Sequence, residues 1–455
     1  MVKQTASTNA NQQLIELVNE KFNESFDFMK KQLQIDNSEA MIMYIKTVVD
    51  GTQLQEIIIK PFFEMKSSDN FLSYLNSLPQ QQEIKEKEQV IAELTKGSVL
   101  IFVKQQNILI DLKSLKNNNV LETNIEPTIL GQKLGLSESI EVNINLIRQQ
   151  YHQPSLIVEM KEIGQKVHKA LAIIYDKDTV NQAVLKNIRE KISKLDLEVI
   201  HSSSELQRFL NDYQRSLLPT MMVTERTDRI VTNLAGGKVI ILVNGSPTVV
   251  IAPAVFFDFM TSMEDNFQLF WVTRFTKVLR FFGLFVCLLL PGLYVAVTSF
   301  NPEFLRAELA LSVAGSRIGV PYPSFIEVLF LLIFMEFLTE ASIRLPKAIS
   351  GTATTVGGLI LGTAATEAAL TSNIMVIIVS AVAIATFAIP INEMSFGIRI
   401  VRYFLLLFST IAGLLGLILS FLGFVMYLAN KNSFGEPYLK LFIQRKKAEV
   451  KGAKS

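Results

Sequence analysis

The sequence predicts an α/β soluble N-terminal half, built from two related α/β subdomains, followed by an all-α multi-pass membrane domain. Charged residues are scattered from Met1 to about Arg280, as in a globular protein, but long charge-free runs follow. These runs cover 281–302, 348–366, 368–392 and 403–430. Each is close to or longer than the roughly 20 apolar residues that span a bilayer as a helix.

The composition agrees with this division. Of the 455 residues, 49% are hydrophobic and 19% are charged, and the mean hydropathy is +0.32. This is too apolar for an average soluble protein. We place the boundaries at 1–36 (N-terminal segment, partly disordered), 37–120 (first α/β subdomain), 121–258 (connector and second α/β subdomain), 259–430 (membrane domain with an interfacial helix and about five apolar segments) and 431–455 (basic tail).

The soluble half contains an internal repeat. The same pattern of apolar and polar residues occurs in AMIMYIKTVVDGTQLQEIIIKPF, from Ala40, and in LAIIYDKDTVNQAVLKNIREKI, from Leu171. In each, an apolar β-rich run leads through a turn containing a tyrosine to a stretch with helical periodicity. Further on, GSVLIFVKQQNILID and GKVIILVNGSPTVVIAP each predict two strands joined by a short turn. Chance similarity between two ordinary strand-helix units is the alternative.

Residues with catalytic potential do not form a recognisable pattern. The chain has no glycine-rich phosphate loop followed by Lys-Ser or Lys-Thr, and His152, His168 and His201 lack metal-ligand spacing. The only cysteine, Cys287, excludes an intrachain disulfide. We therefore expect no enzyme activity, no cofactor and no bound metal, and the net charge of +2 gives no reason to expect a nucleic-acid partner.

Three carboxylates interrupt the apolar segment SFIEVLFLLIFMEFLTEASIR at 324–344. At 100° per residue Glu336 and Glu340 share one helical face, whereas Glu327 points away from it. Glu340 precedes Arg344 by four residues and can pair with it structurally. Glu336 lies deeper, where an anion must face protein or water. Our hypothesis is that copies of this helix surround an axis, so that Glu336, Glu327 or both face a hydrated cation path.

Glu367 is a second candidate for such a path, or else a neutral carboxyl bonded to a neighbouring helix. It lies near the end of the small-residue run 350–369, which permits close helix packing in an oligomer. Pro321 and Pro323 fix the entry to the glutamate segment and make it a plausible hinge.

The segment between the two halves carries the most specific motifs. LLPTMMVTERTDRI begins at Leu217, NGSP at Asn244 and FFDFM at Phe256, and these are followed by LLPGLYVAVTSFNPE, SRIGVPYPSFIEVL, EASIRLPKAI and SFGEPYL. In this order they closely resemble the A subunits of GerA-type spore germination receptors over about 150–440. The related SpoVAF-type proteins share the same core.

The resemblance implies the A subunit of a nutrient germinant receptor in the spore inner membrane. Such subunits are implied to act with a transporter-like B subunit and a C-subunit lipoprotein. They are implied to form a ring, a pentamer, whose pore releases monovalent cations on nutrient binding. The alternatives are a SpoVAF-like accessory ion channel, a non-conducting scaffold for the B and C subunits, and a secondary transporter, although about five unequal segments lack the repeats usual in transporters.

Within the motif region, Glu225, Arg226, Asp228 and Arg229 are candidates for a subunit or domain interface. Glu225 and Arg226 could form an intersubunit ion pair or a surface pair. A belt of aromatic residues is expected where the first membrane helix meets lipid headgroups. We assign to this belt Phe256, Phe257, Phe259, Phe267, Phe270 and Trp271, with Arg274, Lys277 and Arg280 as neighbouring cationic anchors.

The termini are expected on the cytoplasmic, spore-core side. The N-terminus lacks the apolar core of a secretory signal, and the tail is rich in lysine and arginine, which favours the cytoplasmic face. Five full spans would place the tail outside, so one segment must be re-entrant or interfacial, or the run 403–430 must bend back at Gly413, Gly416 or Gly423.

Overall fold

The computed structural model describes residues 2–35, 38–65, 67–82, 84, 86–114, 123, 126, 128–211 and 216–440. Two compact units are present. Unit 1 comprises 1–214 and 221–253, and unit 2 comprises 215–220 and 254–455. The short stretch 215–220 therefore leaves unit 1 and belongs to the helical unit. The basic residues predicted beyond Lys440 lie outside the described residues.

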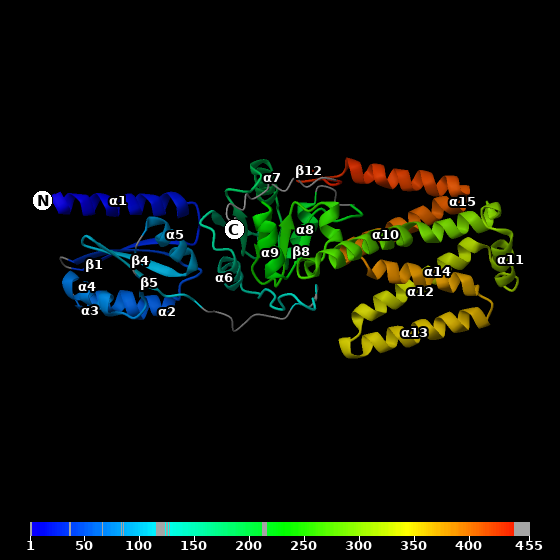
Figure 1. Cartoon of the computed structure of the whole chain (residues 1–455), viewed down its shortest axis with the longest axis horizontal. Helices are drawn as coiled ribbons and strands as arrows, with labels where there is room; N and C mark the ends of the chain where they lie inside the picture. Colours follow the sequence, from blue (N-terminus) through cyan, green and yellow to red (C-terminus); the bar gives the residue numbers. More distant parts are fainter. Residues whose placement is uncertain are drawn as a thin grey trace. The chain divides into compact units, whose positions relative to one another are not determined.

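The first half of unit 1 is a five-stranded antiparallel sheet covered by helices on both faces (Figure 1). Its order is β1-β2-β4-β5-β3. The central strands are apolar on both sides because alternate residues enter two cores: Ile42 and Ile101 face one, and Met43 and Leu100 face the other. The elements are α1 (Val2–Phe22), β1 (Phe28–Ile35), β2 (Ser38–Ile45), α2 (Gly51–Gln53), η1 (Leu54–Ile59), α3 (Lys60–Met65), α4 (Ser68–Ser77), β3 (Gln81–Gln82), α5 (Lys87–Lys96), β4 (Ser98–Val103) and β5 (Gln106–Asp111).

The second half of unit 1 repeats this plan with the order β6-β7-β9-β10-β8. Its elements are α6 (Ile140–Gln150), β6 (Leu156–Ile163), β7 (Lys169–Asp176), α7 (Gln182–Ser193), α8 (Ser203–Leu210), β8 (Met222–Thr224), α9 (Thr227–Ala235), β9 (Val239–Val243) and β10 (Val249–Ala252). The predicted repeat is confirmed, since strands occupy matching positions in both sheets. Asp50 and Asn181, at equivalent places, each cap the following helix through a side-chain oxygen. Tyr44 and Tyr175, however, lie in strands and not in the turns.

A buried ion pair connects the two halves of unit 1. The Arg148 guanidinium on α6 donates from Nε to Asp27 Oδ2 at 2.6 Å and from Nη2 to Asp27 Oδ1 at 2.7 Å. Both side chains are about 2% exposed. Nη2 also donates to Ser25 Oγ at 2.9 Å, and Thr47 Oγ1 donates to Asp27 Oδ2 at 2.5 Å. This network orients the halves of unit 1 against each other, because a buried charge is tolerated only where it is paired and hydrogen-bonded.

Unit 2 is helical. After the short helices η2 (Phe256–Met260) and η3 (Met263–Asn266) come α10 (Phe270–Ser299), η4 (Pro302–Phe304), α11 (Ala307–Ser316), α12 (Ser324–Arg344), α13 (Lys347–Glu367), α14 (Asn373–Phe387) and α15 (Asn392–Asn430), then β11 (Asn432–Ser433) and β12 (Glu436–Pro437). Helix α10 contacts two other helices at different points along its length. Ser299 at its end hydrogen-bonds Ser324 of α12, and Cys287 in its middle contacts Thr386 of α14. We call the end that holds Phe300 the far end and the end that holds Lys431 the near end.

Helix α15 is a hairpin. Residues Ala412 and Gly413 leave helical geometry, and Gly413 adopts φ 59° and ψ −138°, a region open almost only to glycine. The limbs 392–411 and 414–430 meet at this tip and diverge from it (Figure 1). The bend falls at one of the three glycines that the sequence allowed. It returns the chain to the near end, so that α10, α12, α13, α14 and the two limbs make six passes within the described part of unit 2.

Two described helices, α10 and α15, are long and apolar enough to cross a membrane by length and composition, and α14 is apolar but shorter. Helix α12 carries four charges and α13 many small residues, which lowers their hydropathy. The expected division into an α/β front half and a helical rear half is confirmed.

Candidate functional site

Glu336, the carboxylate that the sequence places deepest within the apolar segment 324–344, lies in a cluster of charges between α12 and the first limb of α15. Arg399 Nη1 donates to Glu336 Oε2 at 2.5 Å, and Arg402 Nη2 donates to Oε1 at 2.8 Å. Tyr403 Oη donates to Oε1 at 3.4 Å. The Arg402 side chain is fully buried, and its Nη1 lies 3.9 Å from Cys287 Sγ. With both arginines charged and Glu336 ionised, the cluster carries a net charge of +1 and connects two helices of one chain.

Glu327 is completely buried at the far end, in the first turn of α12. Its Oε1 accepts hydrogen bonds from the Ser372 backbone N–H at 2.6 Å, from Ser372 Oγ at 2.6 Å and from Thr371 Oγ1 at 3.2 Å. Arg317 Nε is 3.3 Å from Oε2. The carboxylate thus joins the start of α14, where a helix N-terminus favours negative charge, to the residue that ends α11.

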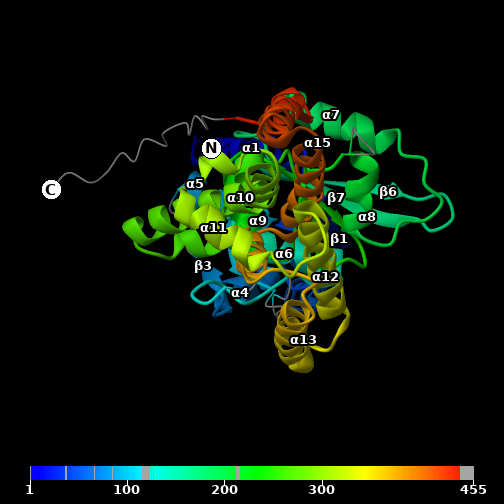
Figure 2. The same ribbon diagram turned by 90° about the vertical axis from the view of Figure 1, so that its right-hand side faces the viewer.

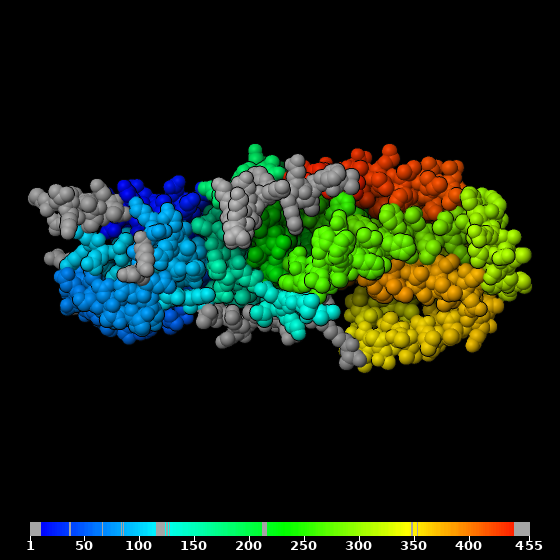
Figure 3. Space-filling view, in the orientation of Figure 1, coloured from blue at the N-terminus to red at the C-terminus, as the bar shows by residue number. Residues whose placement is uncertain are grey.

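The remaining two carboxylates are exposed. Glu340 pairs with Arg344 at 2.6 Å, four residues apart on the surface of α12. Glu367 forms no ion pair with any described residue and lies at the end of an exposed face of α13 that also carries Thr352, Thr363 and the apolar Val356 and Leu359. These residues share a face because positions 352, 363 and 367 fall within about 60° of each other at 100° per residue. Helix α13 lies at the edge of the helical unit, packed on α12 (Figures 2 and 3).

The two predicted hinge prolines lie in the connection from α11 to α12. Pro323 is the N-cap of α12 with φ −65° and ψ 156°, and its carbonyl accepts the Ile326 N–H at 3.1 Å. Pro321 precedes it in the same non-helical stretch. Both therefore stand between Arg317 and Glu327, the two partners of the buried pair at the far end.

The motif residues 225–229 make contacts within unit 1. Arg226 is fully buried and pairs with Asp228 at 2.6 Å, while its Nη1 donates to the Glu126 carbonyl oxygen at 3.0 Å. Arg229 Nε donates to Glu126 Oε2 at 2.9 Å. Glu225 is also buried, and its carbonyl accepts the Leu136 N–H. The surface-pair interpretation of Arg226 is wrong, because this arginine holds the connector against α9.

The aromatic belt is only partly exposed. Phe256 and Phe259 are buried inside the unit, so their assignment to the belt is wrong; Phe256 packs on Tyr438 with ring centroids 6.3 Å apart. Trp271 is 77% exposed at the start of α10, and Arg274, near it, stacks on Phe270 with 5.4 Å to the centroid. Lys277 is half-buried on the same helix.

Arg280, the fourth predicted anchor, has a different contact. Its Nη1 and Nη2 donate to Asp265 at 2.6 and 2.8 Å. Asp265 is nearly buried and also closes the capping box of η3. Arg280 therefore fixes η3 against α10, and the charge pattern of the sequence alone gave no sign of this partner.

Sequence reasoning missed a second feature, the strap 216–220 at the near end. Lys431 Nζ donates to Ser216 Oγ and to the Leu218 carbonyl, and the ammonium lies 5.1 Å from the Tyr438 ring centroid. A Cβ on Gly397 would lie 2.4 Å from the Leu217 carbonyl oxygen, so only glycine lets the strap approach α15 this closely. A single lysine after an apolar helix is expected to be solvated, and the surrounding sequence gave no sign that Lys431 is buried.

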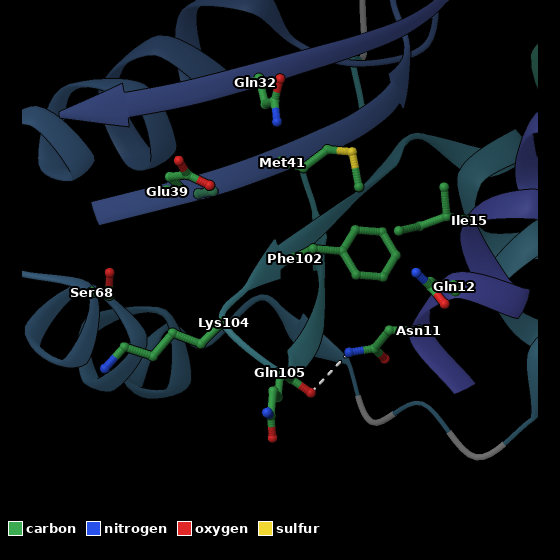
Figure 4. Close-up of a pocket in the computed structure, with 11 residues that line it drawn as sticks. Asn11, Gln12, Ile15, Gln32, Glu39, Met41, Ser68, Phe102, Lys104 and Gln105 are labelled. Carbon is green, nitrogen blue, oxygen red and sulfur yellow. Dashed lines mark hydrogen bonds between the residues drawn. The ribbon is translucent and has the colours of Figure 1, made fainter. Parts of the chain in front are cut away.

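Unit 1 also has a surface pocket of about 450 Å³ beside α1, β2 and β4 (Figure 4). Ile15, Met41 and Phe102 form its apolar wall. Polar side chains surround the opening, where Asn11 Nδ2 donates to the Gln105 carbonyl at 2.9 Å. Within the described residues no cluster of three or more metal-ligating side chains occurs here or elsewhere.

Two helices long and apolar enough to cross a membrane, preceded by two repeated α/β sheets, place the chain among membrane-associated proteins. Residues 16–453 match the family model described as Bacillus/Clostridium GerA spore germination protein. The chain belongs to this GerA family.

Several relatives match over most of their length. Spore germination protein KA of Bacillus subtilis (strain 168) is 30% identical over 91% of this chain and 78% of its own. Spore germination protein GerLA of Bacillus cereus is 33% identical over 77% and 71%, and the uncharacterized membrane protein YfkQ of Bacillus subtilis is 30% identical over 93% and 84%. Among solved structures, the N-terminal domain of the A subunit of the Bacillus megaterium spore germinant receptor GerK3 matches with TM-score 0.41 and 22% identity, over 53% of this chain and 94% of that one.

Proposed function

We propose that this chain is the A subunit of a nutrient germinant receptor in the spore inner membrane, and that its copies form a ring that conducts monovalent cations. Family membership supports the receptor assignment, and the relatives named as spore germination proteins point the same way. The B subunit and the C-subunit lipoprotein are the proposed partners.

The proposed topology follows from the α15 hairpin. Six passes return the chain to Lys431 at the near end, on the same side as the start of α10. This removes the conflict that five spans created with the basic tail, which favours the cytoplasmic face. We therefore place the soluble half and the tail together on the spore-core side.

The exposed face of α13 is the observation that supports a conducting path along this helix. Glu327, Glu336 and Glu340 each lie within 3.3 Å of an arginine in the same chain. Glu367 has no such partner among the described residues. A carboxylate ring attracts cations, whereas the Glu336 cluster, with its net positive charge, repels them. We therefore assign the path to α13, with Glu367 as its acidic residue and the small residues allowing close contact between copies.

The test compares Glu367→Gln with Glu340→Gln in liposomes that contain the receptor with its B and C partners. Cation flux on nutrient addition, its selectivity over anions and the number of A subunits are measured. We expect Glu367→Gln to lower cation flux and selectivity without changing the assembly, and Glu340→Gln to change neither. Unchanged selectivity in Glu367→Gln would remove α13 from the path. Absence of flux in the wild-type assembly would favour the scaffold, and saturable solute exchange a transporter.

A further inference from the structure

Three buried polar atoms at the far end of unit 2 have no hydrogen-bond partner among the described residues. They are the Tyr294 hydroxyl oxygen on α10, Arg317 Nε at the end of α11, and Glu327 Oε2 on α12. Tyr294 is 7% exposed and Glu327 is fully buried. Such atoms are rare in folded proteins, because a buried polar group without a partner loses the hydrogen bonds that it makes to water in the unfolded chain.

The three atoms lie close to one another. Arg317 Nε is 3.3 Å from Glu327 Oε2, but this contact lacks hydrogen-bond geometry. The Tyr294 hydroxyl is near enough to interact with both charges, and Ser372 lies beside it without hydrogen-bond geometry. The other carboxylate oxygen, Glu327 Oε1, already accepts hydrogen bonds from Thr371 and Ser372. The three atoms can therefore share one additional partner.

The chemistry of these atoms determines what the partner is. Arg317 Nε carries a hydrogen and can only donate, so the partner must be an acceptor. The Glu327 carboxylate can only accept, so the partner must also be a donor. A metal cation or an ammonium ion cannot accept, and a halide cannot donate. Water does both, and a buried water typically makes about three hydrogen bonds to polar groups that lack other partners.

We propose that a single water molecule is bound at this place, and we call it the far-end water. It accepts from Arg317 Nε–H, donates to Glu327 Oε2 and makes its third hydrogen bond with the Tyr294 hydroxyl. It thereby links α10, α11 and α12. The Arg317 side chain is 20% exposed, so the site borders the surface of the unit. This inference goes beyond the proposed function and requires neither ion conduction nor assembly.

The link matters most for α11, which lies at the far end (Figure 1). No residue of α11 is buried, so apolar packing contributes little to its position. Arg317 is the C-cap of this helix, and through it the helix reaches the buried carboxylate of Glu327. The far-end water therefore restrains α11, and this restraint can be measured.

The first experiment is radiolytic footprinting of the full chain in nanodiscs. X-rays convert water into hydroxyl radicals, and a bound water labels the side chains beside it even where bulk solvent does not reach. We expect oxidation of Tyr294, located by mass spectrometry, and loss of this label in Arg317→Met, which removes a hydrogen bond of the water. The matched control Arg306→Met, at the exposed start of α11, should keep the label. Met43, fully buried in an apolar core of unit 1, should stay unlabelled.

The second experiment is hydrogen exchange of α11 in the same nanodiscs. Tyr294→Phe removes one hydroxyl group, keeps the packing of the ring, and leaves Arg317 and Glu327 in place. The Tyr294 hydroxyl has no direct hydrogen bond to a described residue, so its removal acts on α11 through the water. We expect faster exchange in α11. The matched control is Tyr322→Phe, which removes a hydroxyl of a 42% exposed tyrosine at the same end and should change nothing.

Three results would overturn the proposal. The first is an unlabelled Tyr294 in a sample where the exposed Tyr322 is labelled. The second is a Tyr294 label that Arg317→Met leaves unchanged, and the third is α11 exchange that Tyr294→Phe leaves unchanged. Failure of the proposed function has a different signature, because neither readout depends on ion flux or on the number of copies.

Discussion

Replacing Glu336 with glutamine should destabilise the helical unit. The change removes the negative charge that pairs with Arg399 and Arg402 but keeps nearly the same volume. Breaking a buried ion pair by removing one partner costs about 3–5 kcal/mol, because the other charge is left buried. The Glu336 side chain is 27% exposed, which permits some hydration, so we expect about 3 kcal/mol, the lower end of this range.

The assay is thermal unfolding of the purified chain in nanodiscs, together with hydrogen exchange of α12 and α15. Glu340→Gln is the matched control, one turn further along α12. Its pair with Arg344 is exposed, and such i, i+4 pairs contribute about 0.3–0.5 kcal/mol. We expect a clear fall in melting temperature and faster exchange in Glu336→Gln, and almost no change in the control.

A compensating variant distinguishes the ion pair from a pore role. Glu336→Gln combined with Arg402→Met removes the buried cation together with its partner, and should recover part of the lost stability because apolar replacements of a whole buried pair are often neutral. If Glu336→Gln is as stable as wild type and changes only ion selectivity, then the carboxylate faces water and the assignment of a structural cluster is refuted.

Two other substitutions test the units separately. Arg148→Met should loosen the halves of unit 1 by about 3–5 kcal/mol, measured as faster hydrogen exchange in β1 and α6. Burial alone would raise the pKa of Asp27, but the Arg148 charge and hydrogen bonds hold this pKa below its usual 3.8. The stabilisation by the pair is therefore full above about pH 4 and is lost as the pH falls through the lowered pKa. An acid titration of the wild type that shows no loss of stability below pH 4 would contradict this. Gly413→Ala should cost about 1–3 kcal/mol through its strained backbone and straighten the hairpin, seen as a greater distance between spin labels on the two limbs, whereas Gly423→Ala should leave the distance unchanged.

The fold of unit 1 was predictable because its signals are local. Apolar β-rich runs, a helix cap at Asp50 and Asn181, and a glycine after α5 and after α9 recur at corresponding positions, and each acts within a few residues. The strands themselves could be placed from such patterns. The pair between Arg148 and Asp27 could not, since it joins residues 121 apart and nothing near either one indicates its partner.

The same limit explains the carboxylates of unit 2. Helical periodicity correctly separated Glu327 from the face of Glu336 and Glu340, and the spacing of four residues indicated the pair with Arg344. The partners of Glu336 come from α15, more than 60 residues later, and those of Glu327 from the start of α14. A charge in an apolar segment shows that a partner is needed, but not whether water, an ion or an arginine provides it.

The buried charges of unit 2 find their partners within one chain. Glu327 connects the Arg317 end of α11 to the first turns of α12 and α14 at the far end, while Lys431 connects the strap to α15 at the near end. Each buried charge would be costly to leave without its partners, so these contacts hold both ends of the unit together. The exposed face of α13, where the described residues form no ion pair, is the surface that we propose for contact with other copies.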